Sequence, residues 1–204
     1  MKFICIGRNY AAHAAELNNP VPKTPLIFTK PDNAMLHDNK PLYYPDFTKD
    51  LHYEVEVLVR IDRLGKHIEP KFAHKYYKDV TVGIDFTARD IQAQLKEKGH
   101  PWEIAKGWDG SAAVGQYIPK EEAFDKDGNI QFSLTKNGEK VQDGDTKNML
   151  TNIDNLIAYV SKFFTLKKGD VIFTGTPKGV GPVQIGDLLK GYIGDKQLLE
   201  CEIR

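Results

Sequence analysis

The sequence lacks the features that mark several specialised classes of protein. Only two cysteines, Cys5 and Cys201, occur in 204 residues. They are too few for a disulfide framework, and neither has the closely spaced partner of a zinc finger. No apolar run approaches the ~20 residues of a membrane span, and the N-terminus lacks the apolar core of a signal peptide. We therefore expect a soluble cytoplasmic protein that does not act at a membrane.

The sequence also lacks an excess of charge of either sign. It carries 28 basic and 28 acidic side chains, for a formal net charge of zero. A nucleic-acid-binding domain normally shows a basic excess or stripe, so nucleic acid is not an expected partner. Cys5 lies within the apolar run 3–6 and is expected to be a small buried hydrophobic residue. The length fits one domain over residues 1–204, large enough to bury a core.

Short segments with strand or helix periodicity follow one another without repeats or linkers. Alternating or apolar runs predict strands at 2–7, 26–29, 54–61, 80–85 and 130–134, the last leading into an Asn137-Gly138 hairpin turn. Helices are predicted from Tyr10 to about Leu17 after an Asn9 cap, from a Thr87/Asp90 capping box to Lys98, and from Thr151/Asp154 onward. The pattern predicts a β-rich α+β fold without the βαβα alternation of a doubly wound sheet.

Two glutamates in a strand are the most informative pair. Glu54 and Glu56 share one face, because side chains two apart on a strand point the same way. Asp85 closes the strand at 80–85, and if the two strands are neighbours the three carboxylates converge. Oxygen ligands suit a hard cation, Mg²⁺ or Mn²⁺. The alternative for the glutamate pair alone is an ordinary solvent-exposed face.

Other polar side chains could complete an active site. His13 and Glu16 are three apart on the first predicted helix, where a carboxylate could orient an imidazole base; the alternative is a surface ion pair. Arg89 and Gln92 have the same spacing on the helix after Asp85. Lys106 has less polar sequence neighbours than most lysines of the chain and could hold an oxyanion. For these side chains too, a solvated surface position is the alternative.

A glycine-rich segment at 174–181 follows a buried strand. Its hydroxyl groups and free backbone N–H groups, Thr176 included, could cradle a carboxylate. It lacks the G-x-x-x-x-G-K-[ST] order of a nucleotide P-loop. The segment 125–129 hints at a calcium loop but lacks the third ligand and the glycine at position six, so a turn is predicted.

Five motifs in fixed order carry a family resemblance over nearly the whole chain. They are Gly-Arg-Asn-Tyr-x-x-His-x-x-Glu at 7–16, Leu-His-Tyr-Glu-Val-Glu at 51–56, Asp-Phe-Thr-Ala-Arg-Asp-x-Gln at 85–92, Lys-Gly-Trp-Asp at 106–109 and Thr-Gly-Thr-Pro-Lys-Gly-Val-Gly-Pro at 174–182. In this combination the chain resembles the fumarylacetoacetate hydrolase superfamily, and within it the single-domain acylpyruvase and oxaloacetate decarboxylase branch.

The resemblance implies a mixed β-strand roll that is usually a homodimer, with a Mg²⁺ or Mn²⁺ ion at its mouth. By motif match it assigns metal ligands (Glu54, Glu56, Asp85), a lid dyad that activates water (His13, Glu16), a lysine that stabilises charge (Lys106) and substrate-binding residues (Arg89, Gln92, Thr176).

The implied reaction is cleavage of a carbon–carbon bond in a short 2,4-dioxo or β-keto acid. Acylpyruvate hydrolysis and oxaloacetate decarboxylation would share one pyruvate enolate chelated at the metal. One alternative is an isomerase or tautomerase acting on oxaloacetate or an unsaturated 2-oxo acid. An alternative of another class is a non-catalytic protein that binds a dicarboxylate.

Overall fold

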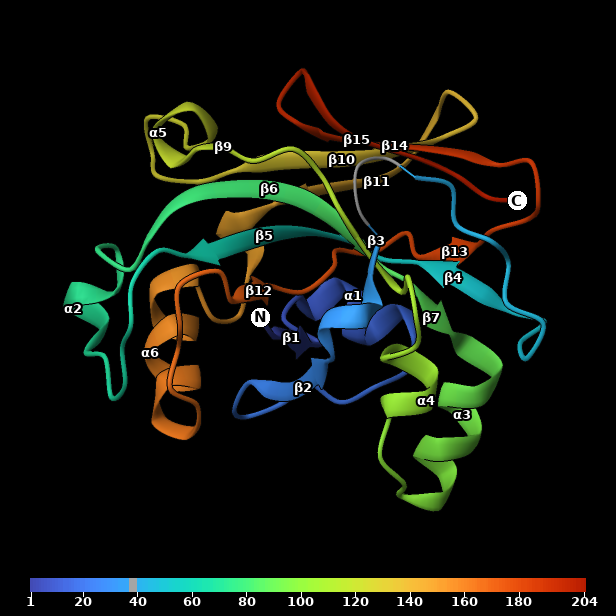
Figure 1. Ribbon diagram of the computed structural model, residues 1–204, viewed down its shortest axis with the longest axis horizontal. Helices are drawn as coiled ribbons and strands as arrows, with labels where there is room; N and C mark the ends of the chain where they lie inside the picture. Colours follow the sequence, from blue (N-terminus) through green and yellow to red (C-terminus); the bar gives the residue numbers. More distant parts are fainter. Residues whose placement is uncertain (37–39) are drawn as a thin grey trace.

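The computed structural model describes residues 1–36 and 40–204, and its centre is a curled, eight-stranded mixed sheet (Figure 1). The order is β2 (Leu26–Lys30), β1 (Phe3–Gly7), β12 (Val171–Phe173), β5 (Val55–Ile61), β6 (Tyr77–Asp85), β8 (Ala112–Val114) and β3 (Met35–Leu36), with β9 (Ile118–Pro119) also on β6. The pairs β1–β12 and β3–β8 are parallel, and β5–β6 is antiparallel. The predicted β-rich α+β class and the curled mixed sheet are confirmed.

Two smaller sheets flank this centre. The four-stranded sheet has the order β11 (Glu139–Asp145), β10 (Gln131–Lys136), β14 (Leu188–Ile193) and β15 (Lys196–Glu202). It lies over β5 and β6 at the top of Figure 1. The third sheet joins β13 (Gly181–Pro182), β4 (Leu51–Tyr53) and β7 (Thr87–Ala88). The predicted hairpin turn joins β10 to β11, and both Asn137 and Gly138 adopt the positive φ that such a turn requires.

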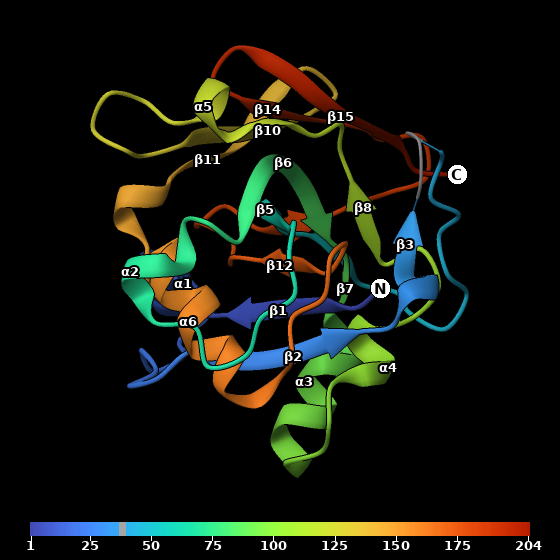
Figure 2. The same cartoon turned by 60° about the vertical axis from the view of Figure 1, so that its left-hand side comes forward.

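Helices lie at the edges of the sheets (Figures 1 and 2). The α-helices are α1 (Ala11–Glu16), α2 (Pro70–Ala73), α3 (Arg89–Lys98), α4 (Glu103–Lys106), α5 (Lys120–Ala123) and α6 (Ile153–Phe163), with 3-10 turns η1 (Asp32–Ala34) and η2 (Thr146–Asn148). Gly99 ends α3 at a φ of 66°, as predicted. None of the helices in the described residues is long and apolar enough to cross a membrane.

Three predicted helix caps are wrong, and at two of them, Asn9 and Thr87, tertiary contacts occupy the capping side chain. Asn9 does not cap α1; its side chain bonds the backbone of Thr151 and Thr174. Thr87 does not open α3 through a capping box, since it lies in β7 and accepts a hydrogen bond from Lys106. At α6 the cap is Asn152 rather than Thr151. The helices themselves occur where they were predicted.

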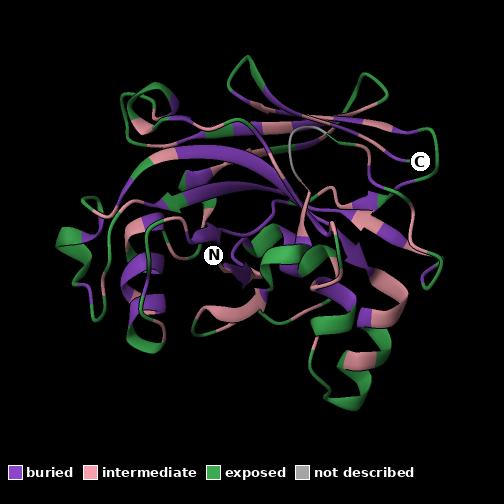
Figure 3. Cartoon of the chain, viewed as in Figure 1, coloured by how far each residue is buried: buried purple, intermediate pink, exposed green. Residues whose placement is uncertain are grey.

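The central strands are covered on both faces, which explains why β5 and β6 are largely apolar (Figure 3). Val55, Val57 and Val59 face the main hydrophobic core under the four-stranded sheet. Leu58 points the other way, into a second cluster that includes the buried Cys5. Because side chains alternate along a strand, Glu54 and Glu56 share the Leu58 face and lie beside this second cluster.

The segment 125–129 is a turn, as predicted. The carboxylate of Asp125 accepts hydrogen bonds from the backbone N–H groups of Asp127 and Asn129, each over 2.9 Å. The Asp125 side chain therefore serves as the hydrogen-bond acceptor for the backbone of its own turn.

Candidate functional site

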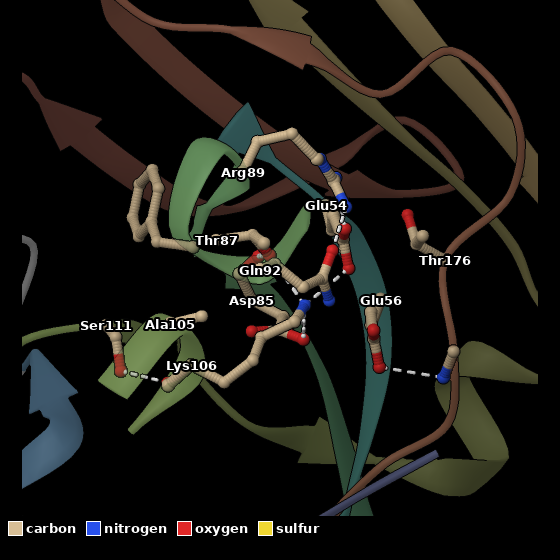
Figure 4. Close-up of polar contacts among 12 residues, drawn as sticks. Glu54, Glu56, Asp85, Thr87, Arg89, Gln92, Ala105, Lys106, Ser111 and Thr176 are labelled. Carbon is tan, nitrogen blue, oxygen red and sulfur yellow. Dashed lines mark hydrogen bonds and ion pairs between the residues drawn. The ribbon is translucent and has the colours of Figure 1, made fainter. Parts of the chain in front are cut away.

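The three carboxylates predicted as metal ligands meet on one face of β5 and β6 (Figure 4). The antiparallel register places Gly83 opposite Glu56 and brings Asp85 next to Glu54, whose carbonyl accepts the Asp85 N–H over 2.9 Å. One oxygen from each side chain lies within 4.8 Å of the others. Glu54, Glu56 and Asp85 are only 5%, 2% and 1% exposed, so the solvent-exposed alternative for the glutamate pair is excluded. This spacing lets one divalent cation draw all three into a shared coordination shell.

Two cationic side chains from the helices reach into this acidic cluster (Figure 4). Lys106, at the end of α4, donates to Glu54 over 2.9 Å, to Asp85 over 2.6 Å and to Thr87 over 2.5 Å. Arg89, at the start of α3, donates to Glu54 over 2.5 Å and to the side-chain oxygen of Gln92 over 2.7 Å. Burial opposes ionisation of Glu54, but Lys106 and then Arg89 outweigh it and hold the pKa of that carboxyl below its usual value. The alternative of solvated surface charges is therefore excluded for Lys106, which is 2% exposed.

Lys30, at the end of β2, is a third cation of this cluster that sequence reasoning missed. Its ammonium group lies 2.7 Å from an oxygen of Asp85, and the residue is 1% exposed. It also donates to the carbonyls of Lys106 and Ser111 and to the Ser111 hydroxyl. Lys30 contacts Oδ1 of Asp85, whereas Lys106 contacts Oδ2, and the bond to the Lys106 carbonyl holds the end of α4 against the sheet. The only hint in the sequence is a lysine directly after an apolar strand and before Pro31.

Glu56 differs from its two neighbours, because no basic side chain in residues 1–36 and 40–204 forms an ion pair with it. Its hydrogen bond is to the backbone N–H of Gly175, over 2.7 Å (Figure 4). Burial, reinforced by repulsion from Asp85, raises the pKa of Glu56 well above its usual value. A bound divalent cation would supply the missing positive charge, and three carboxylate oxygens suit Mg²⁺ or Mn²⁺. The residues present therefore fit such an ion.

The predicted lid dyad lies on α1. His13 is 5% exposed, and its Nδ1 lies 3.4 Å from Oε2 of Glu16. Glu16 in turn accepts the backbone N–H of Gly179, over 2.9 Å to Oε1 and 3.2 Å to Oε2. Glu16 thus joins α1 to the glycine-rich segment. An Nδ1 proton held towards Glu16 would leave Nε2 of His13 as the basic nitrogen.

The glycine-rich segment binds carboxylates of its own chain. Gly175 donates to Glu56 and Gly179 to Glu16, while the Thr176 hydroxyl accepts a hydrogen bond from the Gln142 amide over 2.9 Å. Gly175 has a φ of 104°, and a Cβ there would lie 2.7 Å from Cβ of Asn9. Only glycine fits this close approach, which brings the segment against the acidic cluster.

Eight of the nine predicted site residues line one small cleft, namely His13, Glu54, Glu56, Asp85, Arg89, Gln92, Lys106 and Thr176. The ninth, Glu16, contacts the cleft through His13. Phe28 and Trp102, with ring centroids 5.8 Å apart, form an apolar part of the wall. Arg8 and Lys96 line the same cleft and were not singled out from the sequence. The structure places all nine predicted residues together; their individual roles remain predictions.

Comparison with known proteins agrees with this arrangement. The family model described as "Fumarylacetoacetate (FAA) hydrolase C-terminal" matches residues 2–204. The chain is 43% identical over 188 residues to oxaloacetate tautomerase YcgM of Escherichia coli strain K12, covering 92% of this chain and 86% of that protein. It is 38% identical over 190 residues to a mitochondrial oxaloacetate decarboxylase of Dictyostelium discoideum, covering 93% and 87%.

One similar protein has been solved with a metal ion and a keto acid bound. Fumarylpyruvate hydrolase from Pseudomonas aeruginosa, in complex with Mn²⁺ and pyruvate, superimposes with a TM-score of 0.91 at 35% identity. The match covers 100% of this chain and 89% of that one. The named relatives are enzymes, and the match to the family model spans nearly every residue. The chain belongs to the fumarylacetoacetate hydrolase family.

Proposed function

We propose that this chain is a divalent-metal-dependent enzyme that interconverts the keto and enol forms of oxaloacetate. The observation that carries the proposal is the joint position of the acidic triad, Lys106 and His13 around one small cleft. Keto–enol exchange requires one base and a site that stabilises negative charge on an oxygen, and no nucleophile. The tautomerase relative at 43% identity supports the same substrate.

A divalent ion held by Glu54, Glu56 and Asp85 would polarise the 2-oxo group of a bound keto acid. His13 would remove a proton from C3 through Nε2 and return it to the 2-oxo oxygen, giving the enol. Glu16 would hold the imidazole in the required tautomer, since it already lies against Nδ1. Lys106 would stabilise the charge that develops on the oxygen between these two proton transfers.

The decisive assay follows the ultraviolet absorbance of enol oxaloacetate after mixing with protein, against a buffer blank that records the spontaneous reaction. We expect catalysis with Mg²⁺ or Mn²⁺, loss in EDTA and recovery on adding metal back. Glu54→Gln and Asp85→Asn should lose both metal and activity. Binding of oxaloacetate without any acceleration over the blank would instead identify a non-catalytic dicarboxylate-binding protein.

Cleavage of a carbon–carbon bond is the second candidate, and the His13–Glu16 pair favours it because such a pair can also activate water. The fumarylpyruvate hydrolase and oxaloacetate decarboxylase relatives support this chemistry. Mass spectrometry separates the two candidates, since cleavage releases pyruvate and tautomerisation does not. Assays on oxaloacetate, acetylpyruvate and fumarylpyruvate with each metal would rank the substrates.

A further inference from the structure

One face of α3 carries a series of polar side chains that leads away from the acidic triad. Arg89, Gln92 and Lys96 are three and four residues apart, so they share a face, and all three line the cleft. Arg89 is bonded to Glu54 at the metal end. Lys96 stands seven residues further, which is about 10 Å along a helix axis. The cleft therefore has a cationic group well away from its metal end.

Arg8 approaches this part of the cleft from the other side, at the junction of β1 and α1. It is half-buried, and its φ of 58° lies in the left-handed region. Such a conformation is uncommon for an arginine and is concentrated at functional sites. Arg8 is one of the residues that line the cleft.

Neither Arg8 nor Lys96 forms an ion pair with a carboxylate in the part of the chain that the structure describes. Lys96 donates to the neutral side-chain oxygen of Asn19, over 2.8 Å, and Arg8 has no hydrogen-bond partner there. The two cations are close enough to affect one another. Loss of solvent, followed by the like charges of Arg8 and Arg89, lowers the pKa of Lys96. Arg8 and Lys96 repel one another, and an anion bound between them would relieve that repulsion.

We propose that Arg8 and Lys96 bind the second carboxylate of a substrate whose 2-oxo acid end lies at the acidic triad. This subsite selects dicarboxylic over monocarboxylic 2-oxo acids. The inference rests on the proposed function for the identity of the reacting end, but the subsite itself can be tested without turnover.

The test uses two 2-oxo acids as probes on the Mn²⁺-loaded protein. Pyruvate carries the 2-oxo acid end alone, whereas 3,3-difluorooxaloacetate carries both carboxylates and cannot enolise. Calorimetric titration should show tighter binding of the difluoro compound to the wild type. Arg8→Gln and Lys96→Gln should each weaken that binding about tenfold or more, the usual effect of losing one charge-assisted hydrogen bond, and weaken pyruvate binding far less.

Lys98→Gln is the matched control, because Lys96 and Lys98 are both exposed lysines of the same helix but only Lys96 lines the cleft. It should leave both affinities unchanged. Equal effects of all three substitutions, or none from Arg8→Gln and Lys96→Gln, would overturn the subsite. A wild type that discriminates as expected but does not accelerate enolisation or cleavage of oxaloacetate would overturn the proposed function and support the subsite.

Discussion

Replacing Lys30 by methionine tests whether the buried charges of the site form one interdependent cluster. Lys30→Met keeps a long, unbranched side chain but removes the ammonium group that lies 2.7 Å from Asp85. Asp85 would keep its bond to Lys106 over 2.6 Å. The carbonyl of Ser111 would lose its donor from Lys30. The substitution therefore leaves the buried carboxylate of Asp85 with one of its two cationic partners.

The expected loss is large because both partners are almost fully buried. The side chains of Lys30 and Asp85 are 0% and 1% exposed. Removing one partner of a buried ion pair typically costs about 3–5 kcal/mol. In a protein of this size that lowers the Tm by roughly 6–20 °C. Added Mn²⁺ should recover more stability in the variant than in the wild type, because Asp85 then gains a positive neighbour.

Urea unfolding followed by circular dichroism, with and without Mn²⁺, measures both effects. Lys71→Met is the control, since the Lys71–Glu69 pair has side chains 66% and 61% exposed and should contribute almost nothing. If Lys30→Met unfolded at the same urea concentration as the Lys71→Met control, the interdependence of the buried charges would be refuted.

Four further substitutions or measurements follow from the structure. His13→Ala should reduce acylpyruvate hydrolysis more than oxaloacetate decarboxylation, since only hydrolysis needs an activated water; equal losses in product assays would count against that role. Gly175→Ala should lower both Tm and Mn²⁺ affinity, because its Cβ would lie 2.7 Å from Cβ of Asn9. Asn152→Ala should cost about 1 kcal/mol in urea unfolding, the usual worth of an N-cap, with turnover unaffected. Light scattering should report the homodimer that the family resemblance implies; a monomer at assay concentration would contradict that expectation.

Local patterns in the sequence predicted those parts of the fold in which a strand alternation or a turn signal is clear. The alternation at 80–85 and the Asn137-Gly138 turn specify their strands without help from distant residues. Two of the predicted caps were wrong because the partners of the capping side chains are distant in the sequence. Asn9 and Thr87 have side chains that can cap a helix. Asn9 instead bonds Thr174, 165 residues away, and Thr87 bonds Lys106, 19 residues away.

The candidate site was predictable as a set because its residues lie in motifs, and the two strands that carry the triad are neighbours. The burial of Glu54 and Glu56 was not predictable, because the same pattern also fits a solvent-exposed strand face. The second hydrophobic cluster beside them, which buries them, is visible only in the structure. Lys30 and Arg8 were missed because nothing local distinguishes them from surface cations. Their importance comes from what lies opposite them across the cleft and the sheet.

The central claim is that Glu54, Glu56 and Asp85 hold a divalent cation. Electron paramagnetic resonance of Mn²⁺ titrated into the metal-free protein tests it directly, with Glu56→Gln as the comparison because the amide can still accept the Gly175 N–H. We predict one bound Mn²⁺ per wild-type chain, little or none in the variant, and oxaloacetate turnover that follows occupancy. Full turnover in EDTA, or equal Mn²⁺ binding by the two proteins, would contradict the account.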